Sequence, residues 1–322
     1  MVNDVEKILV SVFVVAYNEE QYISQTLDSI LNQKTDFAFE IICHDDASTD
    51  KTPSIIAEYS KKYPNVVVPV LQKTNKLSTG VNITIEFMYP LAKGKYIAYC
   101  DGDDYWTDSF KLQKQVRFLE NHKDYVMCLH NYVFLYDGKT QKKRKARCGS
   151  FEKDFETEKV LLWGKNIPQI GTSLFIKELA LNRPTLYKKV GDSKSKRPIS
   201  DLPLYIYLST IGKIRYFPST MSVWRRHTGT WDSDKDPIKS FNFLCDLQLF
   251  YEQFDLETNY RYTKVVKRKI ETILFGKAYA LSNYKVAFAY IFKRNQIPFK
   301  SRVVAFIGFL FPKFADRIRK KK

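Results

Sequence analysis

The sequence predicts an α/β fold: a doubly wound, mostly parallel sheet followed by a basic, mainly helical C-terminal region. Residues 8–16, "ILVSVFVVA", are apolar on both faces, as a central parallel strand requires. Strand and helix patterns then alternate as far as about residue 135, which is typical of βαβ units. Beyond residue 236 the strand patterns stop.

The elements of the predicted sheet follow in order along the chain. Residues 19–33 place apolar side chains at helical spacing after the first strand. In the strand at 65–72, Pro69 favours an edge position, because proline cannot donate to a strand ladder. Asp108 is a candidate N-cap for a helix at 109–121. The other expected elements are strands at 39–46 and 95–100, one or two strands at 125–136, and helices at 48–63 and 80–91.

The chain is expected to form two domains. Its 322 residues favour about two domains by length. Residues 1–235 form the predicted α/β domain, and residues 236–322 form the basic, mainly helical region. The polar, basic segment 138–154 is expected to be a solvated loop, with a binding element as the alternative.

Composition indicates the size of the core and the cellular compartment that we expect for the protein. The 44% apolar content is sufficient for a large core. The N-terminus has no secretory pattern, and the apolar run at 8–16 is too short to span a membrane. The five scattered cysteines lack metal-like spacing, so we expect reduced thiols in a cytoplasmic protein.

Positive charge is concentrated at the C-terminal end. The net charge is +17, and residues 261–322 hold seventeen Lys or Arg against two acids. Basic and aromatic residues interleave there, which suits a helix lying in the interface of an anionic membrane. The alternatives are a nucleic-acid surface, disfavoured because no nucleic-acid motif accompanies the basic residues, and a helical cap or homo-oligomer contact.

Carboxylates gather after the predicted strands. Asp101, Asp103 and Asp104 follow the strand at 95–100, and Asp45 and Asp46 end the strand at 39–46. In an open α/β sheet these strand ends meet at one edge, where ligands bind. Crowded carboxylates repel one another, and their oxygens suit a hard cation such as Mg²⁺ or Mn²⁺ that bridges to phosphate. Turn or capping roles are the structural alternative for Asp103 and Asp104.

Glycine-rich phosphate loops are absent from the sequence. The first strand is followed by "AYNEEQY", which is neither a dinucleotide-binding fingerprint nor a P-loop. An ordinary Rossmann dehydrogenase and a P-loop enzyme are therefore disfavoured, and a diphosphate would be handled through metal.

Three segments resemble the nucleotide-binding half of family 2 glycosyltransferases with the GT-A fold. They are "VSVFVVAYNEEQYISQTLDSILNQ", "FEIICHDDASTDKT" and "GKYIAYCDGDDYWTDSFKLQKQVRFLE", which together cover about residues 8–135. A weaker resemblance links "ISDLPLYIYLSTIGKIRYFPSTMSVWRRHTGTW" to the family's acceptor-side segment.

The resemblance implies donor-binding and metal-binding roles. Residues implied to border the nucleoside, or to bind its base, are Ala16, Tyr17, Glu19, Asp45 and Asp46. A carboxylate can accept a hydrogen bond from a uracil N–H. Asp101 and Asp103 match the family's D-x-D motif, with Asp103 the better metal ligand and Asp101 nearer the ribose or sugar.

The acceptor-side resemblance implies the catalytic base and a loop over the diphosphate. Asp201 matches the base, with a helix N-cap as its structural alternative. Arg225 and Arg226 match the diphosphate loop, and His227 is a further candidate metal ligand. The sequence departs from the family at Ala47, where glycine is usual, and at Ser200, where glutamate is common.

The expected function is that of an inverting, metal-dependent glycosyltransferase. It would use Mn²⁺ or Mg²⁺ and a nucleotide-diphosphate sugar, with UDP as the expected nucleotide. The acceptor would be a hydroxyl of a cell-surface glycan or lipid-linked precursor, at the cytoplasmic face of a membrane. The alternative is a nucleotide-sugar-binding partner without turnover in a glycan-synthesis complex.

Overall fold

The computed structural model describes residues 7–136, 142–145, 149–162, 168–188, 201–226, 236–291, 299–313 and 315. The chain divides into two compact units, residues 1–189 with 200–230 and residues 190–199 with 231–322, called unit 1 and unit 2 below. The predicted boundary at 235/236 falls beside residues outside the described ranges and stays a prediction.

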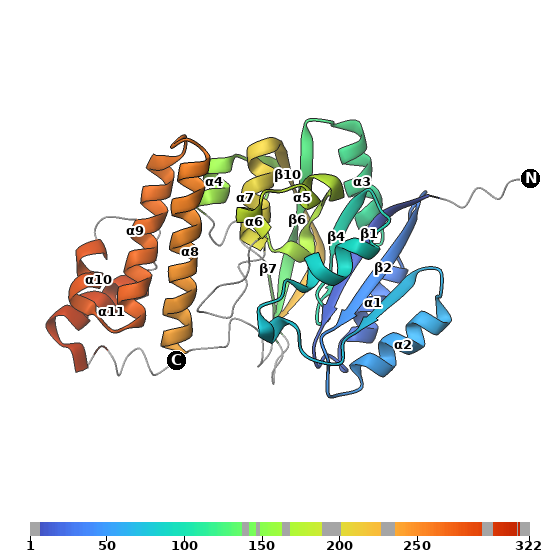
Figure 1. Ribbon diagram of the computed structural model, residues 1–322, viewed down its shortest axis with the longest axis horizontal. Helices are drawn as coiled ribbons and strands as arrows, with labels where there is room; N and C mark the ends of the chain where they lie inside the picture. The colour runs from blue at the N-terminus through green and yellow to red at the C-terminus, as the bar shows by residue number, and fades with distance from the viewer. Residues whose placement is uncertain are drawn as a thin grey trace, which may run out of the picture. The chain divides into compact units, whose positions relative to one another are not determined.

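The sheet of unit 1 begins with four parallel strands (Figure 1). Their spatial order is β3-β2-β1-β4, so the first strand in the chain has β2 on one side and β4 on the other. The four are β1 (Ile8–Ala16), β2 (Ala38–Asp45), β3 (Val67–Leu71) and β4 (Tyr96–Tyr99). As Pro69 predicts, β3 lies at the edge of the sheet.

The second half of the sheet mixes directions. It contains β5 (Tyr105–Trp106), β6 (Tyr125–Tyr136), β9 (Leu174–Ile176) and β10 (Lys213–Arg226). Because β9 is antiparallel to both β4 and β6, and β6 is parallel to β10, the long strands β6 and β10 run in the direction of β1. The predicted α/β class with a mostly parallel sheet is therefore confirmed.

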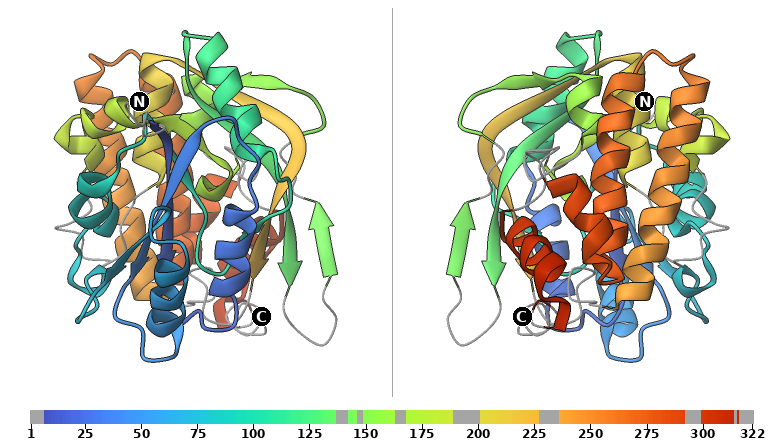
Figure 2. Two further views of the ribbon diagram at one scale, coloured as in Figure 1. Left: turned by 90° about the vertical axis from the view of Figure 1, so that its right-hand side faces the viewer. Right: turned by 90° about the vertical axis from the view of Figure 1, so that its left-hand side faces the viewer.

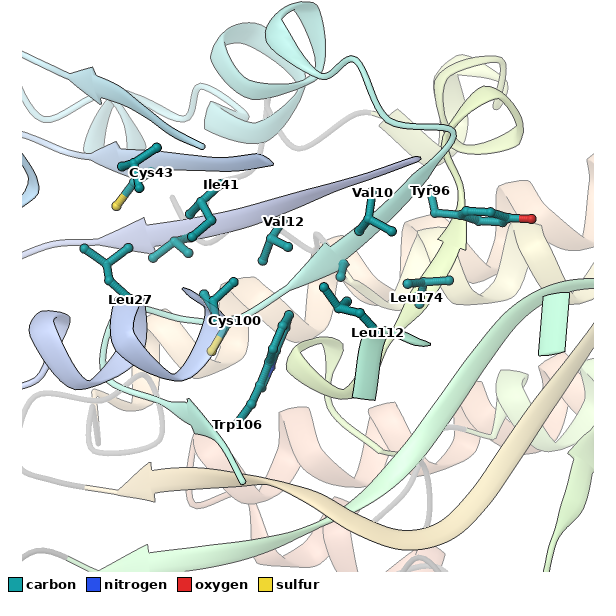
Figure 3. Close-up of a cluster of buried hydrophobic side chains, with 14 of the residues drawn as sticks. Val10, Val12, Leu27, Ile41, Cys43, Tyr96, Cys100, Trp106, Leu112 and Leu174 are labelled. Atoms are coloured by element: carbon teal, nitrogen blue, oxygen red, sulfur yellow. The ribbon is translucent and has the colours of Figure 1, made fainter. Parts of the chain in front are cut away.

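Helices and apolar segments cover both faces of the first four strands. On one face, Val10, Val12 and Val14 pack with side chains from α1 (Ile23–Leu31), α2 (Thr52–Lys62) and α3 (Lys111–Asn121). Figure 3 shows Leu27 of α1 and Leu112 of α3 in this cluster. On the other face, the ring of Phe13 meets Tyr89 and Tyr99 at centroid distances of 5.1 and 5.4 Å.

Three predicted elements differ from the structure. Residues 80–91 form no single α-helix, and Thr84–Met88 is a π-helical turn followed by a 3₁₀ turn, Tyr89–Leu91, which begins beside Pro90. The helix predicted at 109–121 begins at Lys111, with Phe110 as its N-cap residue. Asp108 instead accepts from the Phe110 and Lys111 amides through its side chain and carbonyl, respectively.

The basic segment 138–154 is also predicted as a loop, which holds for residues 149–152 but is wrong at two strand segments. It contains β7 (Lys142–Lys145), which pairs with β6, and the start of β8 (Lys153–Phe155), which pairs with β10. Figure 2 shows β7 as a green arrow beside β6. The remaining helices of unit 1 are α4 (Thr157–Leu161), α5 (Lys177–Leu181), α6 (Thr185–Lys188) and α7 (Asp201–Ile211).

The regular elements of unit 2 in the described residues are all helices. The Asp236 carboxylate caps α8 by accepting from the amides of Ile238 and Lys239. The helices are α8 (Pro237–Glu257), α9 (Thr263–Ala280), α10 (Tyr284–Ile291) and α11 (Phe299–Leu310). The helix α8 packs on α9, and α10 packs on α11 (Figure 2). Within the described ranges, every helix is too short or too polar to span a membrane.

Candidate active site

The loops that follow β1, β2 and β4 meet at the carboxyl edge of the sheet. The Gly102 amide donates to the Val15 carbonyl at 2.8 Å, and the Asp46 amide donates to the Ala16 carbonyl at 3.0 Å. The chain leaves β1 with β2 on one side and β4 on the other, which is the arrangement of a ligand-binding switch point. The predicted meeting of these loops therefore occurs.

Carboxylates from three separate parts of the chain lie close together at this edge. The pKa of Asp101 is raised to about 8, first by burial and then by the negative charges of Asp103, Asp201 and Glu19. Asp103 is close to Asp101 in the sequence, whereas Asp201 and Glu19 act on Asp101 only because folding brings them near. The sequence predicted all four as site residues, and we call them the acidic cluster.

Asp104, the third aspartate of the motif, has a different environment. Its buried carboxylate accepts from the Arg225 amide at 2.8 Å and from the Gln169 side chain at 3.3 Å. Burial and the neighbouring aspartates raise its pKa well above its usual value. Asp104 therefore holds the loop against β10, which agrees with the structural alternative.

The Arg225 side chain also binds the loop that carries Asp103 and Asp104. Its Nε donates to the Asp103 carbonyl at 2.8 Å, and its Nη2 donates to Gln25 at 2.6 Å. The guanidinium lies 4.4 Å from the ring centroid of Tyr22 and 5.3 Å from that of Tyr105. Arg225, predicted as a donor-binding residue, thus makes extensive contacts with the protein itself.

Thr26 is a residue that sequence reasoning missed. It is fully buried on α1, and its hydroxyl lies 2.8 Å from the Gly102 carbonyl and 2.6 Å from the Asp104 carbonyl. The hydroxyl is therefore placed to donate to the loop that carries Asp103. A single threonine on the buried face of a helix gives no sequence signal of such a role.

Asp45 and Asp46 are both buried and both accept hydrogen bonds from the backbone. Asp45 accepts from the amide and hydroxyl of Ser48, whereas the two oxygens of Asp46 accept from the Lys76 and Leu77 amides at 2.7 and 3.1 Å. Asp46 thereby ties the end of β2 to a segment about thirty residues later in the chain. Their predicted contact with a base stays a prediction.

Ala47, which stands where the family usually has glycine, has an unusual backbone conformation. Its φ is +64°, in the left-handed region that glycine adopts without strain. The usual glycine at this position therefore fits the backbone better than the alanine found here. Hydrogen bonds to the loop after β1 hold the shape of this turn. Ser48 accepts from the Asn18 amide, and the Thr49 amide donates to the Asn18 side chain.

The remaining predicted residues lie at the end of β1, in the loop that follows it, and at or after the end of β10. Ala16 is buried, Tyr17 is about half exposed, and the Glu19 amide donates to Thr52 at 2.8 Å. Arg226 lies over the rings of Trp224 and Phe134. His227 lies outside the described residues.

A divalent cation at this edge would be coordinated jointly by protein carboxylates and by oxygens of the substrate. In the described part of the chain, no group of three or more His, Cys, Asp or Glu could by itself hold a metal ion. Sites for Mg²⁺ at phosphates commonly use one or two carboxylates with substrate oxygens completing the shell. The crowded pair Asp101 and Asp103 suits this arrangement, because a cation would compensate both the burial and the repulsion that raise the Asp101 pKa.

Comparisons with known proteins agree with this architecture. Residues 11–181 match the model of the family described as glycosyl transferase family 2. An uncharacterized protein of Mycobacterium tuberculosis is 34% identical over 228 residues, covering 69% of this chain and 60% of the relative. The poly(ribitol-phosphate) beta-glucosyltransferase of Bacillus spizizenii is 43% identical over 121 residues, covering 37% of this chain and 18% of that protein. The chain spans only about 60% of the length of the first of these curated relatives.

Solved structures share the fold at low sequence identity. S. aureus TarS 1-349 in complex with UDP-GlcNAc has a TM-score of 0.55 at 15% identity, covering 94% of this chain and 92% of that one. The mannosyltransferase PcManGT from Pyrobaculum calidifontis, in complex with GDP-Man and Mn²⁺, has a TM-score of 0.51 at 15% identity, covering 94% and 87%. The expected GT-A-like fold is therefore confirmed.

Proposed function

Because this chain belongs to glycosyl transferase family 2, we propose that it transfers a sugar from a nucleotide-diphosphate sugar to a hydroxyl of an acceptor, with inversion at the anomeric carbon. The observation that carries the proposal is the acidic cluster at the switch point of the sheet. Glu19, Asp201 and the neighbouring pair Asp101 and Asp103 come from three distant parts of the chain, yet the other three charges act on Asp101. Such a concentration of carboxylates destabilises the free protein unless a cation or a proton compensates it.

In the proposed reaction the chain's own residues position two substrates and remove one proton. Asp201, the first residue of α7, accepts the proton of the acceptor hydroxyl as its oxygen attacks the anomeric carbon. General-base assistance of this kind contributes about 10²- to 10⁴-fold in rate. One displacement without a covalent intermediate inverts the anomeric centre.

The leaving nucleoside diphosphate needs compensation of its negative charge. Asp103 and Asp101 would hold a divalent Mn²⁺ or Mg²⁺ ion, which supplies Lewis-acid stabilisation of the diphosphate. Tyr17, Glu19 and Asp46 border the nucleoside in this proposal, and Arg226 and His227 belong to the loop over the diphosphate. UDP is the proposed nucleotide, which is supported by the UDP-GlcNAc complex of TarS with the same fold.

The proposed acceptor is a cell-surface glycan or its lipid-linked precursor. Support comes from the relative named as a poly(ribitol-phosphate) beta-glucosyltransferase, whose acceptor is itself a polymer. The basic surplus of residues 261–322 supports a position at the cytoplasmic face of an anionic membrane.

Calorimetric titration of UDP, with GDP in parallel, tests the donor site. We expect UDP to bind more tightly with Mn²⁺ than without it, and Asp103→Ala to abolish that metal dependence. Asp36→Ala is the matched control. Asp36 is an exposed aspartate before the amino end of β2, whereas the candidate site lies at the carboxyl end of the strands. Metal-independent binding in the unchanged protein, or no binding of either nucleotide, would remove the basis of the proposal.

Substitution of the proposed base separates catalysis from binding. Asp201→Asn should lower the transfer rate by about 10²-fold or more while the affinity for Mn²⁺ and UDP changes little. A non-catalytic nucleotide-sugar-binding partner would show no transfer in either form. Transfer that persists unchanged in Asp201→Asn would assign the base elsewhere.

A further inference from the structure

The helix α11 carries an apolar stripe on its solvent side. Phe299, Val303, Phe306 and Leu310 are spaced by four, three and four residues, which places them on one face of a helix. Their exposed fractions are 81%, 37%, 46% and 51%. We call these four residues the α11 stripe.

The opposite face of α11 is already used for packing within unit 2. Ala305 is buried in a cluster with Ala287 and Phe275, and Val304 is buried with Tyr284. At Gly308, an added Cβ would lie 2.3 Å from the Tyr284 ring, so α10 and α11 approach closely there. The α11 stripe is therefore a second apolar face of a helix whose core-facing side is complete.

Exposure of four large apolar side chains in one row is unfavourable in water, and such patches mark interaction surfaces. Two further aromatic residues extend this exposed surface. Phe309 is partly exposed while its ring stacks on Phe288 at 4.4 Å, and Phe311 directly follows the helix and is exposed. The row is thus wide enough to be covered by a partner surface.

The positive charge of the C-terminal residues indicates which kind of partner would cover the α11 stripe. Residues 284–322 contain eleven Lys or Arg and a single acid, Asp316, and Arg302 lies on α11 itself. A second copy of this chain would bring two such basic regions together, and like charges disfavour that contact. Nucleic acid offers phosphates but gives valine and leucine nothing to stack on. An anionic lipid surface satisfies both the apolar row and the basic flank.

We propose that unit 2 docks on an anionic lipid bilayer through the α11 stripe. The helix is about 18 Å long, too short to cross a hydrocarbon core of about 30 Å, so it lies in the plane of the interface. Phe299, Phe306 and Leu310 enter the boundary between headgroups and acyl chains. Arg302 on the same helix adds positive charge at this surface. This inference deepens the proposed function, which supplies its setting, but its test does not use the acidic cluster.

Co-sedimentation of the full chain with vesicles tests the proposal without nucleotide or acceptor. We expect binding to phosphatidylcholine vesicles that contain phosphatidylglycerol, weak binding to phosphatidylcholine alone, and a loss of affinity at high salt. The double variant Phe299→Ala/Phe306→Ala should bind the anionic vesicles about tenfold more weakly. Phe151→Ala, which removes an exposed phenylalanine from unit 1, should bind as the unchanged protein does.

Three results would overturn the proposal. They are equal binding of the double variant and the unchanged protein, equal binding to neutral and anionic vesicles, and a lipid-free dimer in sedimentation velocity that the double variant abolishes. Circular dichroism and the thermal midpoint establish that the double variant is folded. Titration of Mn²⁺ and UDP in the same variants separates the two proposals: intact nucleotide binding without vesicle binding rejects this inference alone.

Discussion

Arg225 is buried, and its guanidinium contacts groups from other segments. It links the loop after β4, through the Asp103 carbonyl, to Gln25 on α1. The rings of Tyr22 and Tyr105 lie near its guanidinium. A planar fork with several donors can make these contacts at once, whereas a lysine ammonium cannot reproduce their geometry. We therefore assign Arg225 a positioning role toward Asp103, beside its predicted role at the diphosphate.

Replacement of Arg225 by lysine tests that positioning role. Arg225→Lys should weaken the binding of UDP in the presence of Mn²⁺ by about tenfold, because the arginine loses its hydrogen bond to the loop at Asp103 and its anchor on Gln25, each of about 1 kcal/mol. Gln25→Met removes only the Nη2 partner and should show a smaller loss in the same direction. Calorimetric titration measures both. Unchanged affinity in both variants would mean that the arginine does not set the position of Asp103.

At the scale of single residues, the sequence predicted chemical identity better than contacts. Asp101 and Asp103 could be named because they follow a buried strand at the edge where ligands bind, whereas Glu19 and Asp201 were named from the family resemblance. The partners of Asp46, the Lys76 and Leu77 amides, lie thirty residues away and belong to a segment without a clear pattern. The role of Thr26 was equally hidden, because a hydroxyl contact across 76 residues leaves no mark on the local sequence.

At the scale of elements, the loop between β4 and β5 lies directly on the end of β1. A Cβ added to Gly102 would meet the Val15 carbonyl oxygen and the Ala16 Cβ, each at 2.9 Å. The Val15 oxygen and the Ala16 Cα, 3.1 Å away, belong to the backbone of a central strand and cannot move away cheaply. The glycine between Asp101 and Asp103 is therefore needed for the loop to lie close to the strand.

Gly102→Ala should lift this loop away from β1. We expect a destabilisation of about 1–3 kcal/mol, as for overpacking in a core, and a loss of Mn²⁺-dependent UDP binding because Asp101 and Asp103 move together. Chemical denaturation and calorimetric titration measure the two effects. Gly276→Ala on α9, where the nearest atom is a methyl of Leu244 at 3.0 Å, should leave UDP binding unchanged. Normal UDP binding by Gly102→Ala would show that the loop tolerates displacement.

Elements were predictable where local pattern and tertiary burial agree. The strands β1 and β4 are almost entirely apolar and mostly buried, because both of their faces are covered. The strand β7 has the sequence "KKRK", whose strand conformation comes from pairing with β6 rather than from its own residues. Residues 80–91 show the reverse case, in which a helical pattern gives way to π and 3₁₀ turns around Pro90.

At the scale of the whole molecule, charge was predictable in its distribution but not in its burial. The basic C-terminal end follows from counting residues. Lys111 does not, because it stands in the polar helix pattern "KLQKQVRFLEN" and yet is fully buried. Its ammonium donates to Gln115 at 2.8 Å and lies 4.1 Å from the centroid of the Trp106 ring. Burial lowers the Lys111 pKa to about 7.

This lowered pKa makes the stability of unit 1 depend on pH in a defined direction. Between pH 7 and the ordinary lysine value of 10.5, the unfolded chain keeps a proton that the folded chain has lost. The free energy of unfolding therefore rises with pH across that window. Below pH 7 both states are protonated, and the folded protein bears the full cost of the buried charge.

Lys111→Met should flatten this pH dependence. The variant keeps an apolar chain of similar length but cannot titrate, so its free energy of unfolding should gain less than that of the unchanged protein between pH 7 and 10. At pH 6 the unchanged protein should lose about 2 kcal/mol or more relative to the variant, compared with their difference at pH 10. Urea denaturation across this pH range measures the two slopes.

The slope of the pH dependence is the decisive quantity, because Lys111→Met also leaves Gln115 without its donor and removes the contact with Trp106. Those losses shift the whole curve and do not change its slope. Lys114→Met on the same helix removes an exposed lysine paired with Asp108, and its curve should stay parallel to that of the unchanged protein above pH 7. Parallel curves for Lys111→Met as well would show that the buried amine does not titrate in this range.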